Sequence, residues 1–147
     1  MSSSAPDEAP QEVMVGPHMF RWEPPDIGCV IYHGDLDGPT TADLSEAGRR
    51  FTKGRPYVFL LVDVSKLGKV SAEARRGSAT GGKDINLRGV AVVGASATLR
   101  VISSLVTRAV DLLNGNTDNP TRFFQTEAEA RAWITGRRQQ VQKSQIT

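Results

Sequence analysis

The chain has 147 residues, enough for one domain with a substantial hydrophobic core. Hydrophobic residues make up 39% of it and charged residues 23%, which is ordinary for a soluble globular protein. The 18 basic and 16 acidic residues are interspersed and leave a formal net charge of +2. The sequence therefore lacks the basic stripe expected of a protein that binds nucleic acid or an anionic membrane.

The N-terminal residues 1–15 are predicted to be disordered, because residues 1–11 are rich in Ser, Ala, Pro and acids. They lack the apolar core of a secretory signal peptide, and no apolar run approaches the roughly 18 residues needed to span a bilayer. The single cysteine, Cys29, favours a reducing compartment, so we expect a cytoplasmic protein. Its apolar neighbours are typical of a small core residue rather than of a nucleophile.

The first half of the chain predicts two strands, a helix and a central strand at residues 18–22, 27–32, 40–53 and 57–64. Thr40 is expected to cap the helix, and Gly54 with Pro56 ends it. The continuous apolar run from Tyr57 to Val62 indicates a strand covered on both faces, as in a parallel sheet.

The second half predicts a weak helix, a strand, a long helix, a short strand and a last helix at residues 71–79, 90–93, 96–114, 122–124 and 126–136. Ser71 is a good N-cap, but Gly77 weakens the helix that follows it. Thr126 and Glu129 form a capping box. The order β-β-α-β-α-β-α-β-α predicts an α/β fold with a mainly parallel sheet. We expect the chain to form one domain at residues 16–136, followed by a polar tail at residues 137–147.

No residue pattern indicates catalysis, so we expect a protein that is not an enzyme and needs no cofactor. His18 and His33 lack a second ligand at metal-binding spacing, which argues against a metal site. Asp35 and Asp37 are better explained as turn residues than as paired catalytic acids. The junction before Ser96, with Arg100 one turn later, offers free amides that favour an anion, but it matches no known phosphate loop.

The stretch from Asp63 to Ala74 is the most informative part of the sequence. It leads a buried strand out through polar residues into the weak helix at Ser71, and a helix that buries little suits a surface that faces a partner. A loosely packed edge helix is the equally weighted alternative. The predicted partner-binding residues are Ser65, Lys66, Ser71, Ala72, Glu73, Arg75 and Arg76.

The element order, together with His33-Gly34-Asp35-Leu36-Asp37, Val62-Asp63-Val64-Ser65 and the Ser71 junction, resembles a STAS-type domain. The closing Arg122-Phe123-Phe124 and the helix around Trp133 are similar to those of the bacterial SpoIIAA-like branch. The resemblance covers about residues 18–134. It implies a signalling module related to the anti-sigma factor antagonists.

In those antagonists a serine at the start of the second helix, within Asp-Ser-Ser-Gly, is phosphorylated by a partner kinase. The matching positions in this chain are Ser71, Ala72, Glu73 and Ala74, so the phosphoacceptor position is Ala72, which has no hydroxyl. The resemblance therefore implies a protein-interaction module without the usual phosphoserine. Ser71 could accept a phosphate instead, although its role as an N-cap already explains it.

A carrier of a small apolar ligand or lipid is the alternative, because SpoIIAA-like proteins share a fold resemblance with CRAL-TRIO domains. The broad apolar surface of the helix at 96–114 could line a pocket, close a dimer or be buried in the core, and the last is the commonest outcome. We also predict a homodimer through the side of this helix that carries Val101, Leu105 and Leu112.

Overall fold

The computed structural model describes residues 8–80, 85–97, 100 and 118–146. Most of the helix expected at 96–114 lies outside the described residues, as do the dimer positions expected on it. The elements, in chain order, are β1 (Gln11–Val15), β2 (His18–Glu23), β3 (Ile27–Ile31), β4 (Gly34–Leu36), α1 (Gly38–Thr52), β5 (Val58–Asp63), β6 (Leu67–Val70), α2 (Ala72–Thr80), β7 (Leu87–Val93), β8 (Thr121–Phe124) and α4 (Glu127–Ile146).

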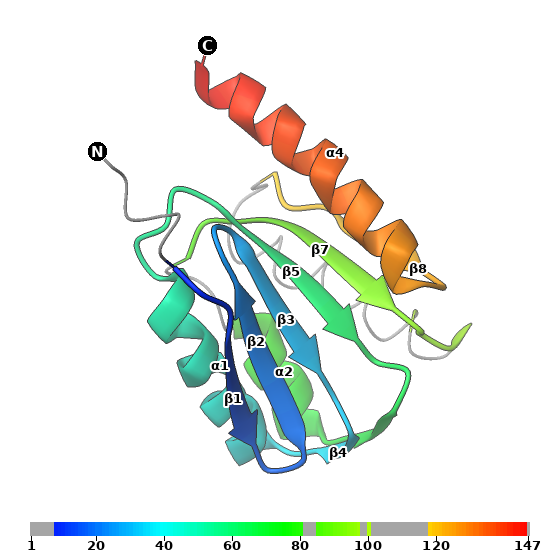
Figure 1. The fold of residues 1–147 in the computed structure, drawn as a ribbon. Coiled ribbons are helices and arrows are strands. Elements are labelled where there is room, and N and C mark those ends of the chain that lie inside the picture. The colour runs from blue at the N-terminus through cyan, green and yellow to red at the C-terminus, as the bar shows by residue number, and fades with distance from the viewer. Residues whose placement is uncertain (1–7, 81–84, 98–99, 101–117, 147) are drawn as a thin grey trace.

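The main sheet has six strands in the order β1-β2-β3-β5-β7-β8 (Figure 1). The first three strands pair antiparallel, and the pairs from β3 through β5 and β7 to β8 are all parallel. The predicted α/β fold with a mainly parallel sheet is confirmed. A second, two-stranded parallel sheet joins β4 to β6 and was not predicted.

Helices cover both faces of the main sheet (Figure 1). From β3 to β5 and on to β7 the chain moves in one direction across the sheet. Because parallel crossovers are right-handed, both connecting helices, α1 and α2, fall on the same face. The opposite face is left for α4, which follows the last strand and packs on β5, β7 and β8.

The core on the α1 and α2 face depends on the alternation of β2. Along this strand His18, Phe20 and Trp22 are buried, whereas the residues between them are half-buried on the other face. The rings of Phe20 and Trp22 both stack against Phe51 of α1. The buried members of this cluster are Phe20, Trp22, Leu36, Leu44, Val58 and Ala74.

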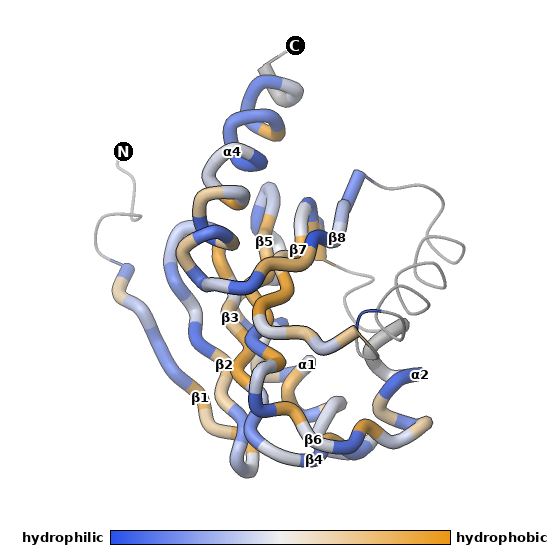
Figure 2. Tube along the Cα trace, turned by 90° about the vertical axis from the view of Figure 1, so that its right-hand side faces the viewer, coloured by the Kyte–Doolittle hydropathy of each residue, from blue (hydrophilic) through white to orange (hydrophobic). Residues whose placement is uncertain are grey.

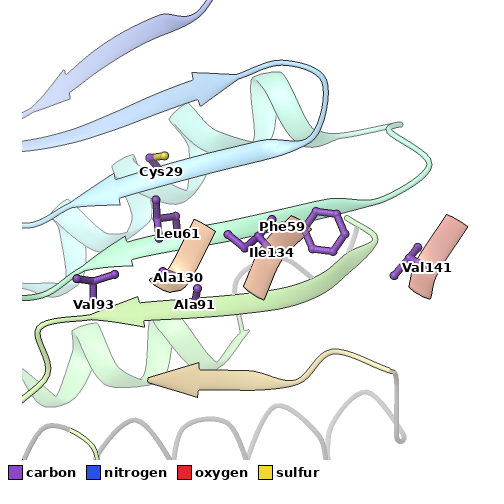
Figure 3. Close-up of a cluster of buried hydrophobic side chains, with 8 residues drawn as sticks. All are labelled: Cys29, Phe59, Leu61, Ala91, Val93, Ala130, Ile134 and Val141. Carbon is purple, nitrogen blue, oxygen red and sulfur yellow. The ribbon is translucent and has the colours of Figure 1, made fainter. Parts of the chain in front are cut away.

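The core on the α4 face draws on three central strands and one face of the helix (Figure 3). Its buried members are Cys29, Phe59, Leu61, Ala91, Val93, Ala130, Ile134 and Val141. In Figure 2 the central strands carry the most hydrophobic residues, and α4 alternates between hydrophobic and hydrophilic residues along its length. This alternation is the pattern of a helix with one face on a core.

Two arginine–carboxylate pairs attach α4 to the sheet and its turn. Arg131 donates two hydrogen bonds, of 2.8 and 2.9 Å, to the carboxylate of Glu23 at the end of β2. Arg138 donates two, of 2.7 and 2.8 Å, to Asp26 in the turn between β2 and β3. Such bidentate pairs fix geometry as well as adding stabilisation. The two pairs therefore hold α4 in place across the sheet.

The two ends of the chain differ from the prediction. Residues 11–15, expected to be disordered, form β1, which pairs along its length with β2. The polar tail expected at 137–147 instead continues α4 as far as Ile146, because Arg137 and Val141 are buried against the sheet. Asp37, not Thr40, caps α1, since its carboxylate accepts from the Thr40 amide at 2.8 Å.

The Glu23–Arg131 pair predicts a pH dependence of stability. The hydrogen bonds from Arg131 lower the pKa of Glu23 from 4.5 to about 2, so its contribution is complete above pH 4.5 and is lost as pH falls towards 2. The full shift corresponds to about 3 kcal/mol, and solvent screening of this partly exposed pair reduces that to about 1–2 kcal/mol.

Chemical denaturation between pH 2 and 7 measures this contribution. On acidification, we expect the free energy of unfolding of wild type to fall by about 1–2 kcal/mol more than that of Glu23→Gln. The other acidic groups titrate in both proteins and cancel in the comparison, and the exposed Glu46→Gln is the surface control. Equal losses in wild type and Glu23→Gln would show that the pair contributes nothing.

Candidate functional site

The predicted partner surface begins where β5 leaves the sheet at Asp63. The Asp63 carboxylate accepts hydrogen bonds from the Ser65 amide at 2.9 Å and from the Ser65 hydroxyl at 2.7 Å. This side chain–backbone turn directs the chain outward, as aspartate commonly does after a strand. The Ser65 hydroxyl therefore contributes to the shape of the turn.

The next segment, β6, is held by β4 rather than by the main sheet. The Gly34 amide donates to the Lys66 carbonyl at 2.9 Å, and the Ser71 amide donates to the Leu36 carbonyl at 3.0 Å. Between these bonds the ladder is irregular, and the Asp35 carboxylate takes the place of a backbone acceptor by binding the Lys69 amide at 2.7 Å. The stretch predicted as a simple polar exit is thus an ordered strand.

Buried His18 fixes the start of β4. Its Nδ1 accepts from the His33 amide at 2.9 Å, so its Nε2 carries the proton and donates to the Asp35 carbonyl at 3.0 Å. The ring is fully buried and packs edge-on against Tyr32. His18 is therefore a structural residue that connects β2 to the small sheet.

Ser71 caps α2 as predicted. Its hydroxyl accepts from the Ala74 amide at 3.0 Å, and its carbonyl accepts the first helical bond, from Arg75. Ala72 is the first residue of the helix and is exposed. The position that corresponds to the phosphoacceptor of the antagonists therefore lies on the surface, with a methyl group in place of a hydroxyl.

The helix α2 packs more closely than its sequence suggests. Ala74 is fully buried in the core beneath it. A Cβ on Gly77 would lie 3.2 Å from the Thr41 methyl group of α1, so the glycine lets the two helices approach. Glu73 lies beside Gly38, the first residue of α1, where a carboxylate suits the positive end of a helix. Gly77 serves packing here, which weakens the argument for an easily displaced helix.

All seven predicted partner-binding residues are exposed. The backbone that carries them is fixed by the Asp63 turn, the β4–β6 ladder and the Ser71 cap, so the structure brings them onto one continuous, ordered segment. We call residues 65–76 the β6–α2 surface. Its exposed charged side chains are Lys66, Lys69, Glu73, Arg75 and Arg76. Basic groups therefore predominate on this surface.

The second predicted site, at Ser96 and Arg100, begins at the edge of the sheet where β5 leads into the β6–α2 surface. A Cβ on Gly94 would lie 2.7 Å from the Ser65 Cβ, so the exits of β7 and β5 touch. The Arg100 amide donates to the Ser96 carbonyl, as in the first turn of a helix, and the Arg100 guanidinium lies over the Phe123 ring at 5.8 Å. Anion binding by Ser96 and Arg100 stays a prediction.

The described residues offer little else with a chemical role. They contain no group of three or more His, Cys, Asp or Glu side chains placed to hold a metal ion, and no helix among them is long and apolar enough to cross a membrane. Burial and the neighbouring Glu23 carboxylate raise the pKa of Cys29 to about 12, so its thiol stays protonated at neutral pH. The helix on which the apolar-ligand alternative depends lies outside the described residues.

Three residues that shape this surface were not identified from the sequence. Asp35 and Lys69 lie far apart in the chain and are brought together by the pairing of β4 with β6, and His18 reaches β4 from β2 through its ring hydrogen bonds. The sequence favours a turn role for Asp35, because Asp37 and Gly38 follow it. No local pattern indicates a parallel pairing of such short strands, because the pairing contacts are long-range.

A substitution at Gly68 tests whether the Asp35–Lys69 hydrogen bond holds the backbone of the β6–α2 surface in place. A Cβ at this position would overlap the Asp35 carboxylate that binds the Lys69 amide. We expect Gly68→Ala to displace that carboxylate, to cost about 1–3 kcal/mol and to speed amide exchange at Lys69. The matched control is Gly136→Ala in α4, where a Cβ meets nothing within 4 Å and should stabilise by about 0.5–1 kcal/mol. A protected Lys69 amide in Gly68→Ala would contradict this account.

Comparison with known proteins identifies the fold of the chain but no function. No family model and no curated protein matches the sequence. A solved structure of an uncharacterized protein of the DUF3478 family from Shewanella loihica PV-4, described as having a SpoIIAA-like fold, matches with a TM-score of 0.54. The two sequences are 16% identical, over 85% of this chain and 91% of that one. The chain has a SpoIIAA-like fold.

Proposed function

We propose that this chain is a non-enzymatic protein-interaction module of a signalling system, and that its partner binds the β6–α2 surface. The observation that carries the proposal is the exposure of all seven predicted residues on a segment whose backbone is held by side-chain and ladder hydrogen bonds. A surface that is already ordered loses little conformational entropy on binding.

The charges of the surface favour an acidic partner. The exposed basic side chains are Lys66, Lys69, Arg75 and Arg76, and the nearby acidic ones are Glu73 and Asp35, whose carboxylate binds the Lys69 amide. Complementary charges around an interface raise the association rate and reject partners of the wrong sign. The expected partner is therefore a protein with an acidic patch, bound more weakly as salt increases.

The electrostatics of the described residues support a role other than catalysis. Catalytic groups are usually gathered in a cleft with perturbed pKa values. Here the carboxylates of lowered pKa are held by arginines on other parts of the molecule, as in Glu8, Glu23 and Asp118, or cap a helix, as in Asp37. Their shifts are explained by structural pairing.

The resemblance to anti-sigma factor antagonists bears on regulation. The exposed Ala72 removes the hydroxyl that a kinase would modify, and the Ser71 hydroxyl is engaged in capping. The module that we propose is therefore regulated by something other than the usual phosphoserine. The single buried thiol is compatible with action in the cytoplasm.

Charge reversal tests the proposal. Tagged wild type and the double variant Lys66→Glu, Lys69→Glu are used to recover partners from lysate of the native source, with Lys53→Glu, an exposed lysine after α1, as the matched control. We expect a partner that wild type and the control recover and the double variant loses. Calorimetry with that purified partner should show a loss of affinity of about tenfold or more at low salt.

Two results would count against the proposal. Undiminished binding by the double variant would move the interface elsewhere, and recovery of no partner at low salt would remove the support for an interaction module. Circular dichroism and melting temperature establish that each variant is folded before binding is compared.

A further inference from the structure

The strand β1 forms one edge of the main sheet. In the part of the chain that the structure describes, it pairs with β2 on one side and with no strand on the other. Every second backbone amide and carbonyl of an edge strand points away from the sheet, so the outer side of β1 can pair with another strand. Pro10 and the Gly16-Pro17 turn limit this edge to five residues, Gln11–Val15.

The side chains of β1 do little to discourage such pairing. Val13 and Val15 are half-buried on the α1 face, where they lie opposite the buried Phe20 and His18 of β2. Glu12 and Met14 point to the other face, and Met14 is 62% exposed. Natural edge strands are commonly protected by several charges, a bulge or a proline within the strand. Here the strand itself carries one charge.

The helix α4 leaves this part of the sheet uncovered. It packs on β5, β7 and β8, and in Figure 1 it crosses the sheet on the side away from β1. The α4 face of β1 therefore presents Met14 beside the charged pair of Glu12 and Arg21, which are 3.2 Å apart. An apolar side chain next to a charged rim is the composition of a protein interface.

We propose that β1 pairs antiparallel with β1 of a second copy of this chain, about a two-fold axis through Val13. The pairing joins the two six-stranded sheets into one continuous sheet. Val13 of each copy faces Val13 of the other, Glu12 faces Met14, and Gln11 faces Val15. All five residues of β1 are paired, and no like charges are opposed.

Symmetry and charge select this register. A two-fold axis perpendicular to the sheet requires one residue to face its own copy. An axis through Glu12 would oppose two carboxylates directly, which is destabilising. An axis through Met14 would pair only residues 13–15, because the chain turns at Gly16. The axis through Val13 avoids both penalties.

This inference goes beyond the proposed function and does not depend on it. In Figure 2, β1 lies on the left, α2 on the right and β6 at the bottom, so pairing at the outer edge of β1 leaves the β6–α2 surface of each copy exposed. Two such surfaces on one particle would bind a partner that has two sites with increased avidity. If the chain does not dimerise, the proposed partner binding at the β6–α2 surface is unaffected.

Opposite charges at Met14 test the register by sedimentation velocity across a range of protein concentrations. Because Met14 faces Glu12 of the second copy, Met14→Glu should weaken the dimer by about tenfold or more. Met14→Lys should tighten it about two- to twentyfold, since two ion pairs form across the axis. Each variant is first compared with wild type by circular dichroism, because this exposed side chain should tolerate either charge.

Cysteine cross-linking supplies the second test. Directly opposed residues in antiparallel strands have Cβ atoms about 4.5–5.5 Å apart, close to the range that a disulfide spans. Val13→Cys should therefore form a covalent dimer on mild oxidation faster than Met14→Cys, which faces Glu12. Wild type is the control, since its Cys29 is buried.

Several outcomes would overturn the proposal. The proposal fails if wild type is monomeric at every concentration. It also fails if the β1 amides are protected from hydrogen exchange only when another protein is added, because the edge then pairs with a strand of that protein. Weakening by both Met14→Lys and Met14→Glu would indicate simple apolar association. Faster cross-linking of Met14→Cys than of Val13→Cys would place the axis elsewhere.

Discussion

The architecture follows from the need of a parallel sheet to be covered on both faces. Right-handed crossovers place α1 and α2 together on one face. The other face is covered by α4, which follows β8 and is not a crossover between two of the described strands. Its place is set by Ala130, Ile134 and Val141 in the core and by the pairs of Arg131 and Arg138 with acids near β2. Without this helix the hydrophobic strands β5 and β7 would be open to water.

The same constraint explains why the molecule has two different edges. The carboxyl ends of the parallel strands meet at one end of the sheet, where β4, β6 and the start of α2 form an ordered, charged segment. The outer side of β1 lies at a different boundary, where the antiparallel hairpin extends beyond the reach of α4. The first edge presents side-chain charge on a fixed backbone, and the second presents the backbone itself. They are therefore suited to different kinds of association.

Likeness of fold and likeness of function separate clearly in this protein. A TM-score of 0.54 at 16% identity describes a common chain path, and the matched protein is itself uncharacterized. The feature that would transfer the antagonist switch is a hydroxyl at the first residue of α2, and Ala72 lacks it. What this chain has at that position is an exposed methyl group beside a capping serine. Any function must therefore be argued from its own surface.

Much of the fold could be predicted from the sequence, because its signals are local. The apolar run at Tyr57–Val62 indicated the central strand, the Thr126 and Glu129 pair indicated the start of α4, and Ser71 indicated the start of α2. The regions where prediction was wrong had polar or mixed sequences whose order comes from distant partners. β1 is ordered by pairing with β2, and the end of α4 is ordered by burial of Val141 and Arg137.

The candidate site divides in the same way. The sequence by itself predicted seven exposed residues of the β6–α2 surface, because a strand exit followed by a capped helix is recognisable from residue type and spacing. Only the tertiary structure decided that His18 and Asp35 hold this surface, that Gly77 fits α2 against α1, and that β1 pairs on one side only among the described residues. These features depend on contacts between residues far apart in the chain, and such contacts leave no periodic pattern in the sequence.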